Sequence, residues 1–325
     1  MLDSAELIAA AAELRAAGEP FVIATVVRVR GSSYRRPGAR MILSERGRIA
    51  GSVSGGCLEG NLVRTGLWKT ADGPVIVTFD STDPDDPDAV LGCGGVVDIL
   101  LERGGPRDPL VLASEVLATG RSAAIATALT GPELGMHRII EPPGEHTGAT
   151  KPWHDGDVLI EPITPPIQLY VFGAGLDAVP VVEAATRLGW TIHLWSGAPR
   201  FENAARFPLA TLLEGDLDAV RVRIDASDRA VAIVMSHHQR RDQAALAMLV
   251  ASRAAYIGVL GPRHRAVEIA APGTLDDPRV HAPVGLDLGA ETPAEIAVAV
   301  IAEVLAAIRG TTAASLRTRA TIHSR

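Results

Sequence analysis

The chain has 325 residues and a formal net charge of −7, and its length predicts about two domains. With 47% hydrophobic and 21% charged residues, its composition excludes a disordered protein. The acidic balance and the 4% aromatic content argue against a nucleic-acid binder, which needs phosphate-neutralising cations or base-stacking rings. Two cysteines are too few for a disulfide scaffold, so we expect a reducing, cytoplasmic location.

The first 20 residues carry apolar side chains at helical spacing and end at Pro20, which predicts an amphipathic first helix. Asp3 and Glu6 are unlike the basic start of a signal peptide, and no apolar run approaches the roughly 20 residues of a membrane span. Apolar, β-branched runs then predict strands at 21–29, 39–43, up to Val53, 75–79 and 96–101, and a helix ending near Lys69.

The middle of the chain is less regular. Residues 103–109 and 141–157 are rich in Gly and Pro and are expected to be loops, with a helix near 110–119 and a strand near 122–129. The proline-rich stretch 161–166 is interpreted as a stiff linker, giving an N-terminal domain of residues 1–164 and a C-terminal domain of residues 165–325.

From residue 167 onward, strand and helix patterns alternate. Strands are expected at 167–172, 190–195, 230–235 and 255–259, and helices at 175–188, 240–252 and 293–309. Thr292 and Glu295 form the sequence signature of a capping box at the start of the last helix. We therefore expect an α/β protein with a Rossmann-like, doubly wound parallel sheet at the C-terminus and an α+β domain at the N-terminus.

A glycine-rich turn follows the first strand of the alternating region. Gly173, Gly175 and Ala178 have the spacing of a dinucleotide-binding turn, in which the glycines allow a tight turn and a close approach of phosphate to backbone amides. The next strand offers Ser196 instead of the acidic residue that holds the ribose of NAD, and Arg200 lies nearby. NAD(P) binding is thus one hypothesis, and a Rossmann fold without a working dinucleotide site is the other.

The two cysteines are framed by glycines, which leave room for a ligand to approach the backbone. These residues are Gly55, Gly56, Cys57, Cys93, Gly94 and Gly95. Cys57 precedes an expected helix, where amide donors and the helix dipole favour a thiolate that can act as a metal ligand or a sulfur nucleophile. Glu59 is a candidate proton acceptor or neighbour of a metal. The alternatives are buried thiols without chemistry and a Cys57–Cys93 disulfide.

Two basic segments are candidate anion sites. Arg35, Arg36 and Arg40 lie in a turn with serines and glycines, a set that can hold a phosphate, although a solvated turn would have the same composition. His237 follows a strand of the C-terminal domain, and Arg263 and Arg265 follow the next one, at the sheet edge where open α/β sheets bind ligands. His237 is a candidate proton relay or ligand contact, and a loop-anchoring role is the alternative.

Taken together, these motifs make the chain resemble the XdhC/CoxI family of xanthine dehydrogenase accessory factors. The matching segments are GSSYRRPGARM, GSVSGGCLEG, LGCGG, VFGAGLDA, MSHH, YIGVLGPRHR and APVGLDLGAETPAEIAVAVIAEV, in that order. Leu176 and Ser196 depart from the histidine and aspartate common in the family, which weakens the case for nicotinamide binding.

The resemblance implies a chaperone that binds molybdenum cofactor (molybdopterin), shields it during installation of its terminal sulfur ligand and delivers it to a molybdenum hydroxylase apoenzyme. It implies a cysteine desulfurase as a second partner and a homodimer as the assembly. On this view Cys57 engages or protects the cofactor, Arg35 holds the pterin phosphate or its nucleotide extension, and Cys93, Gly94 and Gly95 support the same pocket.

Two other hypotheses remain open at this point. The glycine turn at Gly173 would suit an NAD(P)-dependent oxidoreductase acting on a small substrate. The thiol of Cys57 would suit a persulfide carrier in a sulfur relay.

Overall fold

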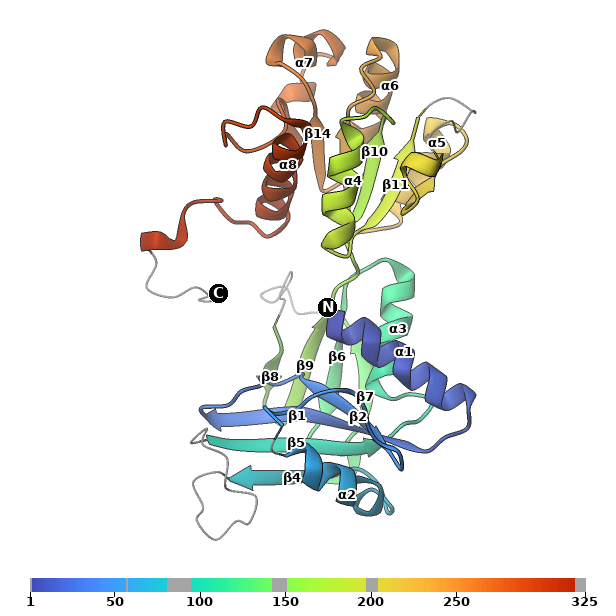
Figure 1. Cartoon of the computed structure of the whole chain (residues 1–325), viewed down its shortest axis with the longest axis vertical. Helices are drawn as coiled ribbons and strands as arrows, with labels where there is room; N and C mark the ends of the chain where they lie inside the picture. Colours follow the sequence, from blue (N-terminus) through green and yellow to red (C-terminus); the bar gives the residue numbers. More distant parts are fainter. Residues whose placement is uncertain (1, 57, 81–94, 142–150, 197–203, 319–325) are drawn as a thin grey trace. The chain divides into compact units, whose positions relative to one another are not determined.

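A computed structural model describes the chain except for residues 1, 57, 81–94, 142–150, 197–203 and 319–325. The chain divides into two compact units, Met1–Thr164 and Pro165–Arg325 (Figure 1). Within the described ranges, no helix has the length and apolar character needed to cross a membrane.

Unit 1 is built on a five-stranded antiparallel sheet in its described part, with the order β3-β2-β1-β5-β4. The strands are β1 (Phe21–Gly31), β2 (Arg40–Ser44), β3 (Gly47–Gly51), β4 (Val75–Asp80) and β5 (Gly95–Arg103). The central strand β1 is buried along its first seven residues, because its run of apolar side chains is covered on both faces of the sheet.

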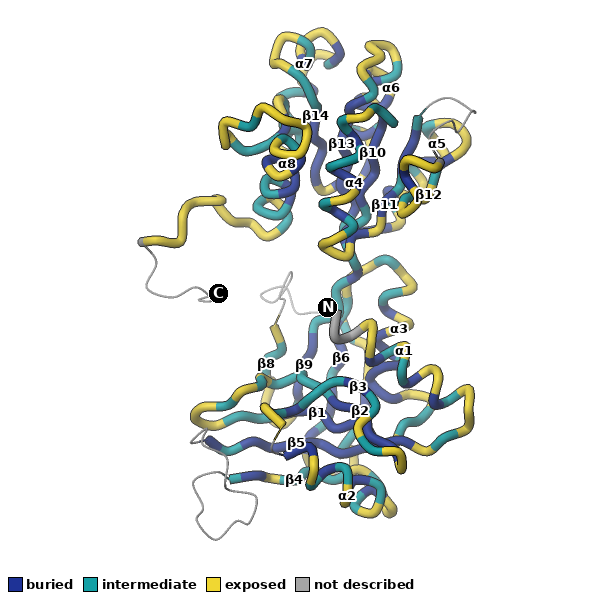
Figure 2. Tube along the Cα trace, viewed as in Figure 1, coloured by how far each residue is buried: buried dark blue, intermediate teal, exposed yellow. Residues whose placement is uncertain are grey.

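A helix packs on each face of this sheet. Helix α2 (Glu59–Lys69) packs on one face, where Leu62 joins a cluster with side chains of β1, β2 and β5. Helix α1 (Leu2–Ala16) packs on the other face through Leu7, Ala11 and Leu14. Figure 2 shows β1, β2 and β5 as mostly buried, whereas the edge strands β3 and β4 are mostly intermediate.

A smaller four-stranded antiparallel sheet completes the described part of unit 1, with the order β7-β6-β9-β8. It contains β6 (Ala123–Ala128), β7 (His137–Ile140), β8 (Trp153–Asp155) and β9 (Val158–Ile163), and helix α3 (Pro109–Thr119) packs on it. Leu129 and Leu159 from this region join Val27 and Leu100 of the larger sheet in one apolar cluster.

Unit 2 has, in its described part, a six-stranded parallel sheet with the order β12-β11-β10-β13-β14-β15. The strands are β10 (Gln168–Phe172), β11 (Thr191–Trp195), β12 (Ala210–Leu212), β13 (Ala230–Val234), β14 (Tyr256–Val259) and β15 (Val280–His281). This order is that of a Rossmann fold, with the chain reversing direction across the sheet between β10 and β13.

Helices cover both faces of the parallel sheet. Alternate residues of β10 separate the two cores: Leu169 and Val171 face α4 (Ala178–Arg187) and α8 (Pro293–Ile308), and Tyr170 and Phe172 face the opposite side. That opposite side is covered by α5 (Leu217–Asp225), α6 (Gln239–Val250) and α7 (Arg263–Ile269). The result is the doubly wound α/β architecture expected from the alternating sequence.

The structure confirms the expected fold class and most of the expected long elements, including the capping box of Thr292 and Glu295 at the start of α8. Several predictions were wrong. The stretch 161–166 is not all linker, because its first three residues complete β9, and the expected loop 141–157 contains β8. The short elements β7, β12 and β15 were not predicted, because two to four residues carry too little periodicity. Helix α5 was not predicted either, because its apolar and charged residues alternate from Val220 to Asp225, a pattern more typical of a strand.

Candidate functional site

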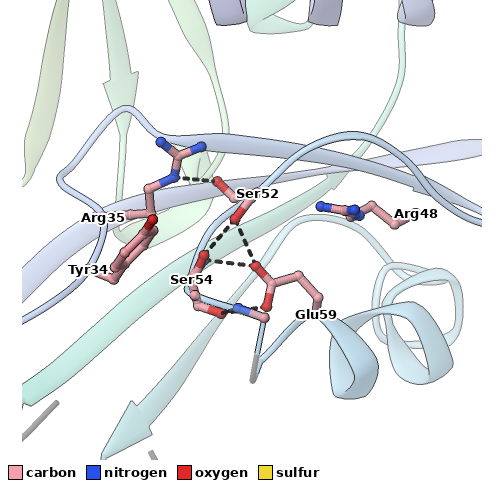
Figure 3. A pocket seen from close by; sticks show the side chains of 8 residues that line it. Tyr34, Arg35, Arg48, Ser52, Ser54 and Glu59 are labelled. Atoms are coloured by element: carbon pink, nitrogen blue, oxygen red, sulfur yellow. Dashed lines mark hydrogen bonds between the residues drawn. The ribbon is translucent and has the colours of Figure 1, made fainter. Parts of the chain in front are cut away.

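A pocket of about 460 Å³ opens in unit 1 where three segments meet (Figure 3). It is lined by Tyr34, Arg35, Arg48, Ser52, Ser54, Gly55, Gly56 and Glu59. The antiparallel order explains why distant residues meet: the turn 32–39 joins β1 to β2, and β3 ends opposite the start of β2, where Met41 pairs with Gly51. The turn and the loop 52–56 are therefore at the same end of the sheet.

Glu59 fixes the loop that forms the floor of the pocket. Its Oε1 accepts hydrogen bonds from Ser52 Oγ (3.0 Å) and from the backbone amide of Ser54 (2.9 Å), and its Oε2 accepts one from Ser54 Oγ. Burial raises the pKa of this carboxyl, but hydrogen bonds from Ser54, Ser52 and the local backbone outweigh burial and leave the pKa of Glu59 below its usual value. The carboxylate is thus ionised and bonded within the loop.

Two glycines of this loop, Gly55 and Gly56, line the pocket, with Gly56 in a left-handed conformation (φ +117°) and open space where a side chain would be. The Ser54 hydroxyl accepts hydrogen bonds from the amides of Gly56 (3.1 Å) and Leu58 (3.3 Å). Cys57, the predicted thiol between these two residues, lies outside the described residues, as do Cys93 and Gly94.

The pocket carries two guanidinium groups on opposite walls. Arg35 Nε donates to the carbonyl oxygen of Ser52 at 3.2 Å, and Arg48 Nη1 donates to the carbonyl oxygen of Gly51 at 3.2 Å. Figure 3 shows Arg35 beside Tyr34 on one side of the loop and Arg48 on the other. With Glu59 as the single carboxylate among the eight lining residues, the lining has a formal charge of +1 and favours an anionic ligand.

The structure does not place every predicted residue at the pocket. Arg40 does not line it, because its guanidinium pairs with Glu161 of β9 at 2.5 Å, with side chains only 11% and 5% exposed. Arg36 is exposed in the same turn and is not among the lining residues. Gly95 begins β5 opposite Gly31 and is also outside the lining set.

Four lining residues were missed from the sequence: Tyr34, Arg48, Ser52 and Ser54. Ser52 and Ser54 adjoin the glycines, so their proximity to the predicted motif was a usable signal. Arg48 had no local signal, because only the pairing of β3 with β2 brings it to the loop.

A second polar cluster lies at the carboxyl ends of the parallel strands in unit 2. Gly173 has φ +135°, and a Cβ there would stand 2.6 Å from the carbonyl oxygen of Met235, so the turn after β10 requires glycine. His237, at φ +57°, places Nε2 2.6 Å from Asp177 Oδ2 and Nδ1 3.4 Å from Arg265 Nη1. The Rossmann crevice therefore contains a hydrogen-bonded chain from Asp177 to Arg265.

Arg265 is the arginine of this cluster, and the predicted Arg263 is the exposed first residue of α7, with no part in these contacts. Arg265 pairs with the buried Asp242, whose Oδ1 also accepts from Ser236 Oγ at 2.5 Å. Arg263 and Arg265 both lie in the first turn of α7 but point in different directions. Only the packing of this helix decides which of the two side chains faces the crevice.

Two features of the described crevice differ from those of a nicotinamide dinucleotide site. The Oδ1 atom of Asp177 lies against the position that a Cβ atom on Gly175 would occupy. In a dinucleotide-binding turn this glycine lets the pyrophosphate approach the backbone, and here the Asp177 carboxylate covers it. At the end of β11, Ser196 offers no carboxylate for a ribose, and its carbonyl oxygen accepts from Arg241 Nη1 at 3.1 Å. Within the described ranges, no three His, Cys, Asp or Glu side chains gather to hold a metal ion.

Comparisons with known proteins agree with this architecture. The family profile described as "XdhC and CoxI family" matches residues 14–80, which include all eight lining residues of the pocket, and the "XdhC Rossmann domain" profile matches residues 169–304. Together they span more than half of the chain.

Relatives align over nearly the whole length. A Bacillus subtilis protein, named as a probable subunit of xanthine dehydrogenase, is 27% identical, with 88% of this chain and 93% of that protein covered. The Escherichia coli molybdenum cofactor insertion chaperone PaoD is 25% identical, with 93% and 88% covered. A crystal structure described as a xanthine dehydrogenase from Bacillus halodurans is 27% identical and superposes with a TM-score of 0.64 over 95% of this chain and 97% of that one. The chain belongs to the XdhC/CoxI family.

Proposed function

We propose that this protein is a maturation factor for a molybdenum hydroxylase: it binds molybdenum cofactor in the pocket of unit 1, protects it during sulfuration and passes it to the apoenzyme. The observation that carries the proposal is the pocket itself, in which Arg35 and Arg48 flank a glycine loop that continues into Cys57. The names of the relatives support it, since PaoD is a molybdenum cofactor insertion chaperone.

The residues of the pocket fit an anionic, oxygen- and sulfur-rich cofactor. Arg35 would hold anionic groups of the cofactor, such as the pterin phosphate or its nucleotide extension, and Gly55 and Gly56 leave room for these groups beside the loop. Glu59 would keep the loop in place without pairing with Arg35, because its oxygens are already bonded to Ser52 and Ser54. When bound, the cofactor supplies the molybdenum centre whose terminal sulfur the hydroxylase needs.

Cys57 is the proposed point of contact with the molybdenum or its sulfur. A thiol in this position, next to Gly56 and before α2, would be favoured as a thiolate by the helix dipole. Its neighbour Glu59 would accept a proton only by giving up a bond to the loop, so we assign it the positioning role first. We also propose a cysteine desulfurase as the sulfur donor, a homodimeric assembly and a cytoplasmic location.

The test is the amount of cofactor that the full chain retains. The protein is expressed in a cofactor-producing host, purified, and oxidised so that bound cofactor becomes a fluorescent pterin. We expect pterin in the wild type and at least about a tenfold loss in Cys57→Ala, the cost of one charge-assisted contact. Met136→Ala, which removes an exposed sulfur-bearing side chain from the same unit, is the matched control. Background pterin in the wild type would reject the proposal.

A further inference from the structure

We propose that the pocket recognises its ligand at two opposite walls: the ring of Tyr34 stacks on a flat heterocycle, and Arg48 binds an anionic arm of the same molecule. The ligand class is therefore a fused-ring heterocycle that carries a phosphate on a side arm. This inference rests on the proposed function and assigns residues that neither the motifs nor the family resemblance singled out.

Tyr34 differs from the other two tyrosines of the chain. Tyr170 and Tyr256 are core residues, only 3% and 0% exposed, whereas Tyr34 is 72% exposed at the rim of the pocket. Its Cγ lies 3.8 Å from the position of a Cβ on Gly55, so the ring rests against a residue without a side chain. A large exposed ring held against a glycine loop is an aromatic platform, and stacking of a base on such a platform contributes about 1–3 kcal/mol.

Arg48 keeps its charge available to a ligand. Two residues earlier on the same hairpin, Arg46 pairs with Glu19 at 2.6 Å, but among the described residues Arg48 has a backbone carbonyl as its hydrogen-bond partner and no carboxylate. Glu59, the one carboxylate among the eight described lining residues, is bonded by Ser52 and Ser54. An anion at this wall therefore meets an uncompensated guanidinium, which can bind phosphate with two parallel hydrogen bonds.

The positions of the two side chains define the shape of the ligand. Figure 3 shows Tyr34 and Arg48 on opposite sides of the loop, with Glu59 and its serines between them. Because the middle of the floor carries a negative charge, the anionic groups of a ligand belong at the ends, near Arg35 and Arg48. A volume of about 460 Å³ lies within the range of small-molecule sites, so a ring and a short arm can both be held.

The experiment measures binding of two probes to the full chain, neopterin and neopterin monophosphate, which share a fluorescent ring and differ in the phosphate. We expect the wild type to prefer the phosphate form, and Arg48→Gln to reduce that preference about tenfold or more while Arg46→Gln leaves it unchanged. Tyr34→Ala should weaken both probes about tenfold, and Tyr34→Phe, which keeps the ring, should bind like the wild type. Retention of co-purified cofactor is measured in parallel for all variants.

The outcomes separate this inference from the proposed function. If the wild type retains cofactor and Tyr34→Ala and Arg48→Gln retain it equally well, the two-wall arrangement is wrong and the maturation role stands. If the wild type retains none and binds neither probe, both are wrong. Loss of retention in Arg48→Gln and Tyr34→Ala, with Arg46→Gln and Tyr34→Phe unaffected and a phosphate preference that depends on Arg48, supports both.

Discussion

Glu59 provides a direct test of how the pocket loop is held. Each hydrogen bond to a charged group contributes about 1.5–3 kcal/mol, and the carboxylate accepts bonds from Ser52 Oγ, Ser54 N and Ser54 Oγ. Glu59→Gln keeps one carbonyl acceptor but loses the charge, so we expect the free energy of local opening to fall by about 2 kcal/mol. Amide hydrogen exchange in the segment 52–59 should then be about 30-fold faster than in the wild type at neutral pH.

The contribution of Glu59 to the stability of the loop should decrease at low pH. The pKa of Glu59 is lower in the folded protein than in the unfolded chain, so its stabilisation is complete above the unfolded value of about 4.3 and is lost as the pH falls through the folded value. The ratio of exchange rates between Glu59→Gln and wild type should therefore be constant well above the unfolded pKa and shrink towards one as the pH falls through the lower folded pKa.

Hydrogen exchange followed by mass spectrometry on the full chain measures both effects, and comparing variants at each pH cancels the intrinsic pH dependence of exchange. Glu45→Gln, an exposed glutamate in the turn between β2 and β3, is the matched control. Equal exchange of the loop in Glu59→Gln and wild type at pH 7, or a difference that persists unchanged at low pH, would show that the carboxylate does not anchor this loop.

Three further predictions concern the rest of the fold. Arg40→Met strands the buried carboxylate of Glu161 and should lower the free energy of unfolding by about 3–5 kcal/mol in urea denaturation, with much of the loss recovered in the double variant Arg40→Met/Glu161→Leu; a loss below about 1 kcal/mol contradicts this account. Gly173→Ala should cost at least about 2 kcal/mol more than Gly189→Ala, because both have positive φ but only the first Cβ meets backbone; equal thermal midpoints would be inconsistent with that steric conflict. NADH and NADPH at about 1 mM should leave the thermal midpoint of the wild type unchanged, because Asp177 covers the phosphate approach, and a clear upward shift would overturn this interpretation of the crevice.

The sequence by itself determined the elements with long, regular patterns. The apolar run of β1, the helix patterns of α1 and α8 and the strand–turn–helix at Gly173 follow from local periodicity and turn chemistry, which act over neighbouring residues. The glycine loop and Arg35 were predicted as candidate site residues in the same way, because each belongs to one continuous motif, and both line the pocket of unit 1.

Tertiary structure decided which side chains share a site. Arg40 and Arg35 are five residues apart in one basic turn, yet the strand pairing of β2 turns Arg40 towards Glu161 and leaves Arg35 at the pocket. Arg48 reaches the same pocket from another strand, and Arg265 rather than Arg263 meets His237 because of how α7 packs. Which arginine reaches a site depends on contacts between segments far apart in the chain. The residue types alone do not indicate which partner neutralises a charge.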